Sequence, residues 1–113
     1  MMLYEEGETL EDVLLSLRPV ADRLVLGVDR ASTDATAKIA RAHADDYFEF
    51  DFHNHFSEVR NEVLRRCKTT WFFQVDGPEF LSTESLPCIE ETKRLSRDQA
   101  AMIDLGLYIW DAW

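Results

Sequence analysis

Carboxylates that follow two apolar runs are the residues of this chain best placed to do chemistry. Asp29 follows the run at residues 24–28, and Asp76 follows the run at residues 71–75. Continuous apolar runs are typical of strands that are covered on both faces of a sheet. Ligands of open α/β sheets bind at the carboxyl ends of such strands, so the pattern predicts a small-molecule site near both aspartates. A carboxylate there can accept a hydrogen bond from a nucleobase N–H or a ribose hydroxyl. The alternative for Asp29 is a turn residue that caps the next helix.

Arg60 is the basic candidate for the same site. It lies near the start of an expected helix, where a guanidinium can pair bidentately with a diphosphate or hold a neighbouring carboxylate. The alternative is an ion pair with Glu58 or Glu62 on a solvated helix face. Asp34 is expected to cap a helix or to face its positive dipole end rather than to bind a ligand.

The elements that position these residues alternate between strand and helix. Helices are predicted from the helical spacing of apolar residues and from capping residues. The predicted helices cover residues 10–17, about 33–43, a segment from Ser57 onward, and about 82–95. Ser32 or Thr33 is the expected cap of the second of these helices. Apolar or alternating runs predict strands over residues 24–28, 47–52, 71–75 and about 100–110. Only residues 1–3 remain for a strand before the first helix. The alternation predicts an α/β fold, a Rossmann-like three-layer sandwich with a mainly parallel sheet, in which residues 24–28 and 71–75 are neighbouring buried strands.

Length and charge restrict the class of protein. The 113 residues are expected to form one domain, residues 1–113, large enough to bury a core. A net charge of −10 disfavours nucleic acid and anionic membranes as partners. No apolar run approaches the ~18 residues of a membrane span, and the first residues do not read as a signal peptide, so a cytoplasmic location is expected. Trp110 and Trp113 could form an exposed patch that makes a homo-oligomer contact.

Three motifs in a fixed order resemble the nucleotide-binding half of a family 2 glycosyltransferase with the GT-A fold. Residues 28–36 read V-D-R-A-S-T-D-A-T, residues 56–61 read F-S-E-V-R-N, and residues 71–79 read W-F-F-Q-V-D-G-P-E. The family commonly shows V-D-x-x-S-x-D-x-T, F-S-x-x-R-N and a Trp-led strand that runs into D-x-D-E, in that order. The resemblance covers residues 3 to about 86, with a shortened first strand and without the acceptor-binding half.

The resemblance implies a role for each matching residue. Asp29 would contact the nucleoside of a nucleoside-diphosphate sugar, Glu6 would lie near the base, and Arg60 would lie near the diphosphate. In the family, two aspartates one residue apart hold Mg²⁺ or Mn²⁺, which bridges the donor's phosphates. Here Asp76 keeps the first position, and a proline, which offers no ligand, occupies the second. Asp76 and Glu79 are therefore the expected metal pair, and the alternative is a plain turn.

The implied function is transfer of a sugar from a nucleotide sugar to an acceptor hydroxyl, with inversion and with a base that the sequence does not single out. Because the second metal-binding aspartate and the acceptor half are missing, the chain by itself is expected to transfer little or no sugar. One alternative is a non-catalytic nucleotide-binding or assembly module. Another is a doubly wound regulatory domain with an acidic pocket, which the motif around Arg60 and the segment at residues 71–79 fit poorly.

Overall fold

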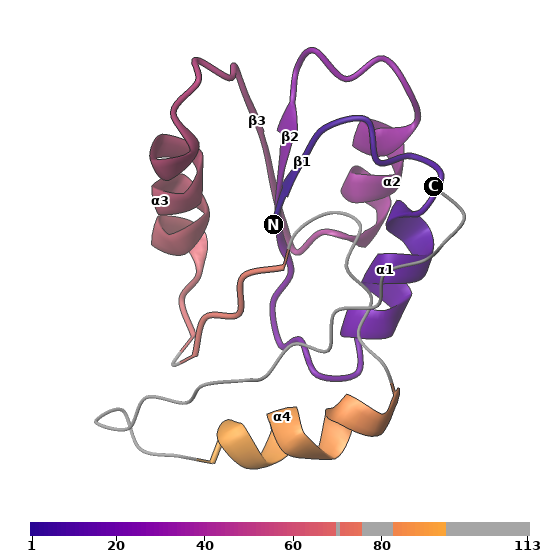
Figure 1. Cartoon of the computed structure of the whole chain (residues 1–113), viewed down its shortest axis with the longest axis vertical. Coiled ribbons are helices and arrows are strands. Elements are labelled where there is room, and N and C mark those ends of the chain that lie inside the picture. The colour runs from indigo at the N-terminus through magenta and orange to yellow at the C-terminus, as the bar shows by residue number, and fades with distance from the viewer. Residues whose placement is uncertain (70, 76–82, 95–113) are drawn as a thin grey trace, which may run out of the picture.

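Three parallel strands form the sheet of this protein in the order β1–β2–β3 (Figure 1). The computed structural model describes residues 1–69, 71–75 and 83–94. The strands are β1 (Met2–Leu3), β2 (Val25–Asp29) and β3 (Asp46–Phe50). β2 lies in the centre: Met2 and Gly27 are partners on one side, and Val25 pairs with Asp46 on the other.

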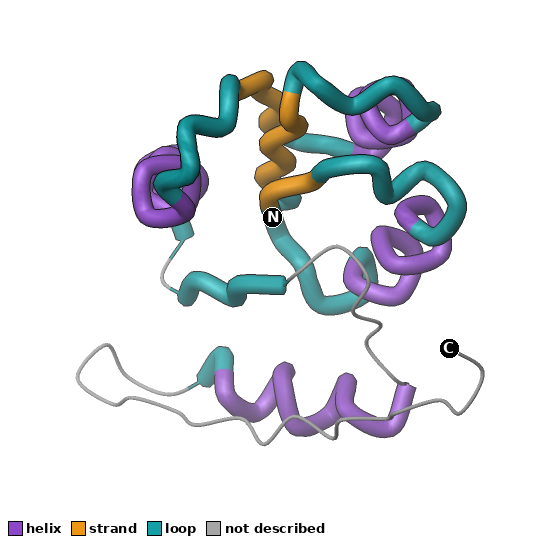
Figure 2. Tube along the Cα trace, turned by 45° about the horizontal axis from the view of Figure 1, so that its top comes forward, coloured by secondary structure: helices purple, strands orange, loops and turns teal. Residues whose placement is uncertain are grey.

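Helices cover both faces of the sheet. Within the described residues these are α1 (Leu10–Leu17), α2 (Thr36–His43), α3 (Phe56–Arg66), the short 3-10 helix η1 (Thr83–Ser85) and α4 (Leu86–Thr92). Figure 2 shows α1 and α2 on one side of the strands and α3 on the other. α4 lies apart from these three layers. No helix among the described residues has the length and apolar character needed to cross a bilayer.

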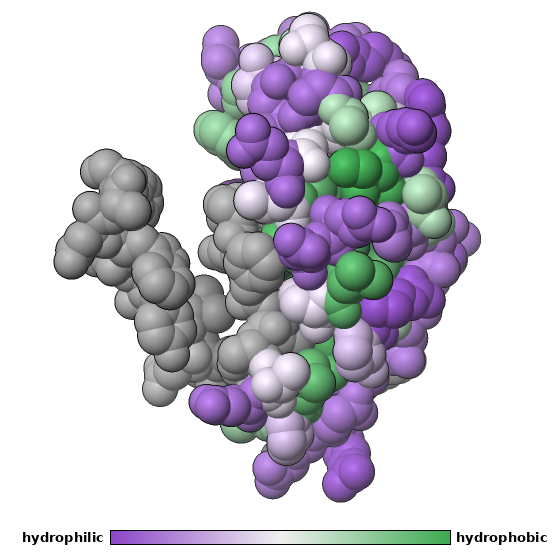
Figure 3. Space-filling view, turned by 90° about the vertical axis from the view of Figure 1, so that its right-hand side faces the viewer, coloured by the Kyte–Doolittle hydropathy of each residue, from purple (hydrophilic) through white to green (hydrophobic). Residues whose placement is uncertain are grey.

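The larger core lies between the sheet and the pair α1 and α2. Leu26 and Val28 of β2 point to this side, where they join Leu10 and Leu14 of α1 and Ala40 of α2 in one buried cluster. The buried residues of α1 recur at helical spacing, which is why this short segment forms a helix with one apolar face. The surface over α1 and α2 is mainly hydrophilic, with separate apolar areas (Figure 3).

The smaller core lies between the sheet and α3, and it depends on a glycine. Val25, Phe48 and Val63 form this cluster, and alternation along β2 turns Gly27 to the same side. A Cβ atom on Gly27 would meet the Phe48 ring, with Cε1 and Cε2 each only 2.9 Å away. Gly27 therefore lets the ring lie directly on the central strand.

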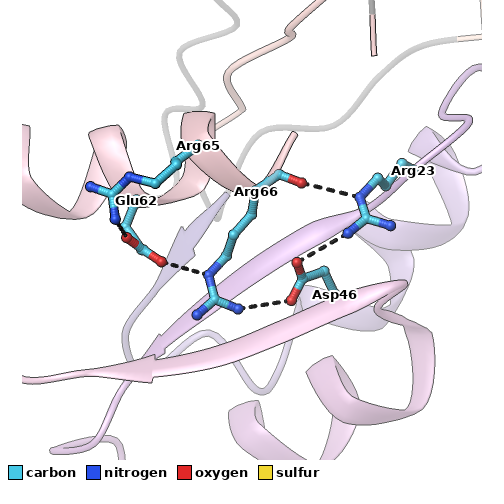
Figure 4. A network of polar contacts seen from close by, with 5 residues as sticks. All are labelled: Arg23, Asp46, Glu62, Arg65 and Arg66. Atoms are coloured by element: carbon cyan, nitrogen blue, oxygen red, sulfur yellow. Dashed lines mark hydrogen bonds and ion pairs between the residues drawn. The ribbon is translucent and has the colours of Figure 1, made fainter. Parts of the chain in front are cut away.

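Five charged residues hold α3 to the amino end of the sheet (Figure 4). Asp46, the first residue of β3, accepts hydrogen bonds from Arg23 Nη2 at 3.1 Å and from Arg66 Nη1 at 2.9 Å. Arg66 Nε also donates to Glu62 at 2.8 Å, and Glu62 pairs with Arg65. Arg23 Nε donates to the carbonyl of Arg66 at 3.2 Å, so the network links α3, β3 and the connection that precedes β2.

The α/β architecture and the parallel sheet predicted from the sequence are confirmed, with small shifts at element ends. The helix expected from residue 33 begins at Thr36, the strand expected over residues 47–52 ends at Phe50, and the first strand is short as expected. The expected last strand, with Trp110 and Trp113, lies outside the described residues.

The strand expected over residues 71–75, beside residues 24–28, is wrong. This segment has no strand assignment, and Phe72 and Phe73 are exposed. Both edges of β2 are already paired with β1 and β3, so no further strand can adjoin it. The free edge of β1 offers only Met2 and Leu3, which is too short an edge for a stable ladder. Val75 still packs into the larger core.

We expect Gly27→Ala to lower the free energy of unfolding by about 1 to 3 kcal/mol, the usual cost of an overpacked core. Urea unfolding measures the change. The double variant Gly27→Ala/Phe48→Leu should be more stable than the sum of the single changes predicts, because the shorter side chain removes the clash. Wild-type stability in Gly27→Ala would contradict this account of the smaller core.

We expect Asp46→Asn to destabilise the fold by about 1 to 2 kcal/mol, because two partly buried guanidinium groups lose their shared carboxylate. Its matched control is Asp51→Asn, whose partner Arg30 lies on the surface, and which should change stability by less than about 0.5 kcal/mol. The two variants are compared by thermal and urea unfolding. Equal effects would show that the network adds nothing beyond a surface ion pair.

Candidate functional site

The loops that follow the three strands form the candidate site. Because the strands are parallel, their carboxyl ends lie at one edge of the sheet, at the top of Figure 1. The first loop follows Leu3, the second follows Asp29, and the third follows Phe50. Each loop leads into a helix that covers the sheet.

The first and second loops are joined by side-chain hydrogen bonds. Three backbone N–H groups of the first loop donate to the second: Glu5 to Ser32 Oγ at 3.2 Å, Glu6 to Thr36 Oγ1 at 2.8 Å, and Gly7 to Asp34 Oδ2 at 2.8 Å. In return, the Glu5 carboxylate accepts hydrogen bonds from the backbone and the hydroxyl of Thr33. These contacts hold the two loops in one arrangement before any ligand arrives.

Asp34 is the centre of this junction. Its Oδ1 accepts the N–H of Thr36 at 2.9 Å and also the Thr36 hydroxyl, which keeps the pKa of Asp34 below its usual value. A Cβ atom on Gly7 would lie 2.8 Å from Asp34 Oδ2, so a glycine is needed for this close approach. Ala35 is the N-cap residue of α2 and has no side-chain cap hydrogen bond, so Asp34 bonds to the first helical residue from just outside the helix, and Ser32 and Thr33, which were expected to cap it, bond to the first loop instead. The Asp34 carboxylate beside the N-terminus of α2 makes this helix end less favourable for a further anion.

Glu6 lies beside the same junction. Its carbonyl accepts hydrogen bonds from the N–H groups of Thr9 at 3.2 Å and Leu10 at 2.9 Å, which starts α1. Partial burial and the neighbouring Asp34 carboxylate raise the pKa of Glu6. Glu6 therefore lies in the loop that follows β1, and its contact with a base stays a prediction.

Asp29 ends β2 at this edge and is partly buried. Its Oδ1 accepts the N–H of Ala31 at 2.9 Å, and its carbonyl accepts the N–H of Ser32 at 3.0 Å. Asp29 therefore stabilises the turn that follows β2, which was the alternative role considered for it from the sequence. Oδ2 has no recorded partner among the described residues, so it can still accept a hydrogen bond from a ligand.

Arg30 is a site residue that the sequence reasoning missed. Its backbone N–H donates to the carbonyl of Phe50 at 3.0 Å, and its Nη1 lies 2.6 Å from Asp51 Oδ2. Its Nε lies 3.6 Å from Glu49. Arg30 thus connects the second loop to the third, and its position next to Asp29 was the available signal.

Arg60 lies on α3, and no contact with Asp29 is recorded within residues 1–69. Its guanidinium lies over the Phe56 ring at 5.9 Å, and the Phe56 and Phe52 rings are 4.9 Å apart. Phe56 is 57% exposed, so this aromatic pair faces solvent beside the third loop. No ion pair between Arg60 and Glu58 or Glu62 is recorded among the described residues, although the sequence left such a pair open as the alternative.

Two non-glycine residues in the described part adopt positive φ angles, and both lie in these loops. Glu5 has a φ of 51° and Asn54 a φ of 63°. Asparagine tolerates this region well, whereas glutamate does so at a cost. Strain of this kind is concentrated at functional sites in proteins. At Glu5, the hydrogen bonds with Ser32 and Thr33 offset the cost of the positive φ angle.

The expected metal pair, Asp76 and Glu79, lies outside the described residues. Among the residues that are described, no group of three or more histidine, cysteine, aspartate or glutamate side chains could hold a metal ion. Any contribution of Asp76 to nucleotide binding is likewise a prediction.

Comparisons with protein-family models, with curated proteins and with solved structures give no match for this chain. The function is therefore argued from the site itself.

We expect Asp34→Ala to lower the urea midpoint at pH 7, because both loops lose their shared acceptor. The pKa of Asp34 is lowered on folding, so its contribution is present above the usual aspartate value of 3.8. That contribution should disappear as the pH falls through the lowered folded value. The difference in urea midpoint between wild type and Asp34→Ala should therefore disappear at acidic pH. Glu91→Ala, a change at an exposed position on α4, is the control. A difference in urea midpoint that does not depend on pH would contradict the stabilising role of the Asp34 carboxylate.

Proposed function

We propose that this domain binds the nucleoside part of a nucleoside-diphosphate sugar at the carboxyl edge of the sheet. The observation that carries the proposal is the preformed junction of the first two loops, which ends at Asp29 with one carboxylate oxygen free of recorded partners. A site ordered in advance loses little entropy when it binds. Its free groups are acceptors, which suit the N–H of a base and the hydroxyls of a ribose.

Charge decides how such a ligand is oriented. Asp34, Glu5 and Glu6 make the junction acidic, and the Asp34 carboxylate lies beside the N-terminus of α2, so phosphates are disfavoured there. The cations described on the side of the third loop are Arg30, which is paired with Asp51, and Arg60, which lies over Phe56. We therefore place the base and ribose at Asp29 and Glu6, with the diphosphate directed away from Asp34.

The motif order supports a glycosyltransferase of GT-A type as the parent class, in which the bound sugar passes to an acceptor hydroxyl. A divalent cation held by Asp76 and Glu79 would neutralise the leaving diphosphate. The second candidate is a nucleotide-binding module without catalysis. Pro78, which stands where the family has a metal-binding aspartate, favours this candidate.

We expect Asp29→Asn to weaken binding of uridine diphosphate about tenfold or more in calorimetry, because a hydrogen bond to a charged acceptor contributes roughly 1.5 to 3 kcal/mol. The asparagine keeps the Oδ1 acceptor for Ala31, so the turn and the thermal midpoint should be preserved. Glu91→Ala serves as the surface control. Equal affinity in wild type and Asp29→Asn would rule out this pocket, and no binding by wild type would rule out the function.

A further inference from the structure

Thr36, the first residue of α2, is a buried polar residue at the junction of the first two loops. Its exposure is 0%, and it is the polar residue that the described part of the chain buries. A buried hydroxyl is tolerated where hydrogen bonds replace those that it would make with water. A valine would fill nearly the same space without needing partners. The reason for a hydroxyl here therefore lies in the groups that it contacts.

The Thr36 hydroxyl joins two groups that belong to different loops. Its hydrogen is donated to Asp34 Oδ1 in the second loop, and its oxygen accepts the backbone N–H of Glu6 in the first loop at 2.8 Å. A hydroxyl has one hydrogen and two lone pairs. Because Asp34 takes the hydrogen, a lone pair is directed to Glu6. The other oxygen of Asp34 accepts the N–H of Gly7 at 2.8 Å, so Thr36 and Asp34 together hold two successive amides.

The contact with Thr36 is the shielded one among those that hold the first loop. The hydrogen bond from Glu6 to Thr36 is partly buried, whereas those that Glu5 and Gly7 make with the second loop are exposed. Water competes for exposed hydrogen bonds, but a buried donor that loses its acceptor stays unsatisfied. The strand β1 adds little, because it pairs with β2 over two residues only. The position of the first loop therefore depends most on the Thr36 hydroxyl.

We propose that Thr36 is a positioning residue of the nucleoside site. Its hydroxyl fixes the first loop, which carries Glu6, against the second loop, which follows Asp29. Thr36 itself does not touch the ligand, because its side chain is fully buried. Without the hydroxyl, the first loop becomes ordered only when the ligand binds, and that ordering lowers the affinity. This inference rests on the proposed function, since the nucleoside site is what the junction orders.

Amide hydrogen exchange tests the loop contact without a ligand. After correction for intrinsic rates, we expect the Glu6 amide of wild type to exchange at least about tenfold more slowly than the Glu5 amide, whose acceptor is exposed. Thr36→Val should abolish this difference, because it keeps a branched side chain but has no oxygen, and Thr36→Ser should retain it. If circular dichroism shows that Thr36→Val is misfolded, Thr36→Ala takes its place, since it differs from Thr36→Ser only by the hydroxyl. Absence of Glu6 protection in wild type, or equal protection with and without the hydroxyl, would overturn the proposal.

Calorimetry with uridine diphosphate tests the consequence for binding. Thr36→Val should bind about tenfold more weakly than wild type, and Thr36→Ser should stay within about threefold of it. Asp46→Asn is the matched control, because it is expected to lose comparable stability at the opposite end of the sheet and should bind as wild type does. Wild-type affinity in Thr36→Val, or an equal loss in Asp46→Asn, would overturn the positioning role and leave the proposed function standing. If wild type binds no uridine diphosphate, the proposed function fails, and the Glu6 exchange rates alone decide whether Thr36 holds the first loop.

Discussion

Burial of β2 on both faces is the constraint on which the rest of the structure depends. Leu26 and Val28 are almost inaccessible on one side, and Val25 is on the other. Neither face of this strand can meet water, so helices have to cover both. Gly27 is the residue of β2 with the least space beside it, since the Phe48 ring occupies the position that a side chain at residue 27 would take. Parallel neighbours on either side then bring the ends of three strands to one edge, and the polar loops meet there.

The two ends of the sheet differ in polarity. At the carboxyl edge, the N–H groups of Glu5, Glu6 and Gly7 already bond to Ser32, Thr36 and Asp34, and Asp29 Oδ2 is an acceptor without a recorded partner among the described residues. At the amino end, the start of β2 and residues 71–75 line a mainly apolar cavity.

The arginines of α3 show how position separates structure from function. Arg66 lies 4.5 Å from the centre of the Phe48 ring and also pairs with Asp46, so it belongs to the packing of α3 on the sheet. Arg60, less than two turns earlier, lies at the surface over Phe56. One end of α3 is thus held by a network of charges. The other end presents an aromatic and cationic surface beside the third loop.

The sequence by itself determined the elements, because periodicity records which face of a segment is apolar: the helical spacing from Leu10 and the unbroken run before Asp29 both predicted what forms. It also placed Asp29 at the carboxyl end of a buried strand and Asp34 beside the start of a helix. Only the tertiary structure decided that Asp34 would bond to Gly7, that Arg30 would join two loops, and that residues 71–75 would lack a strand partner. These outcomes depend on distances between residues far apart in the chain and on which strand edges are already paired, and no local pattern records either.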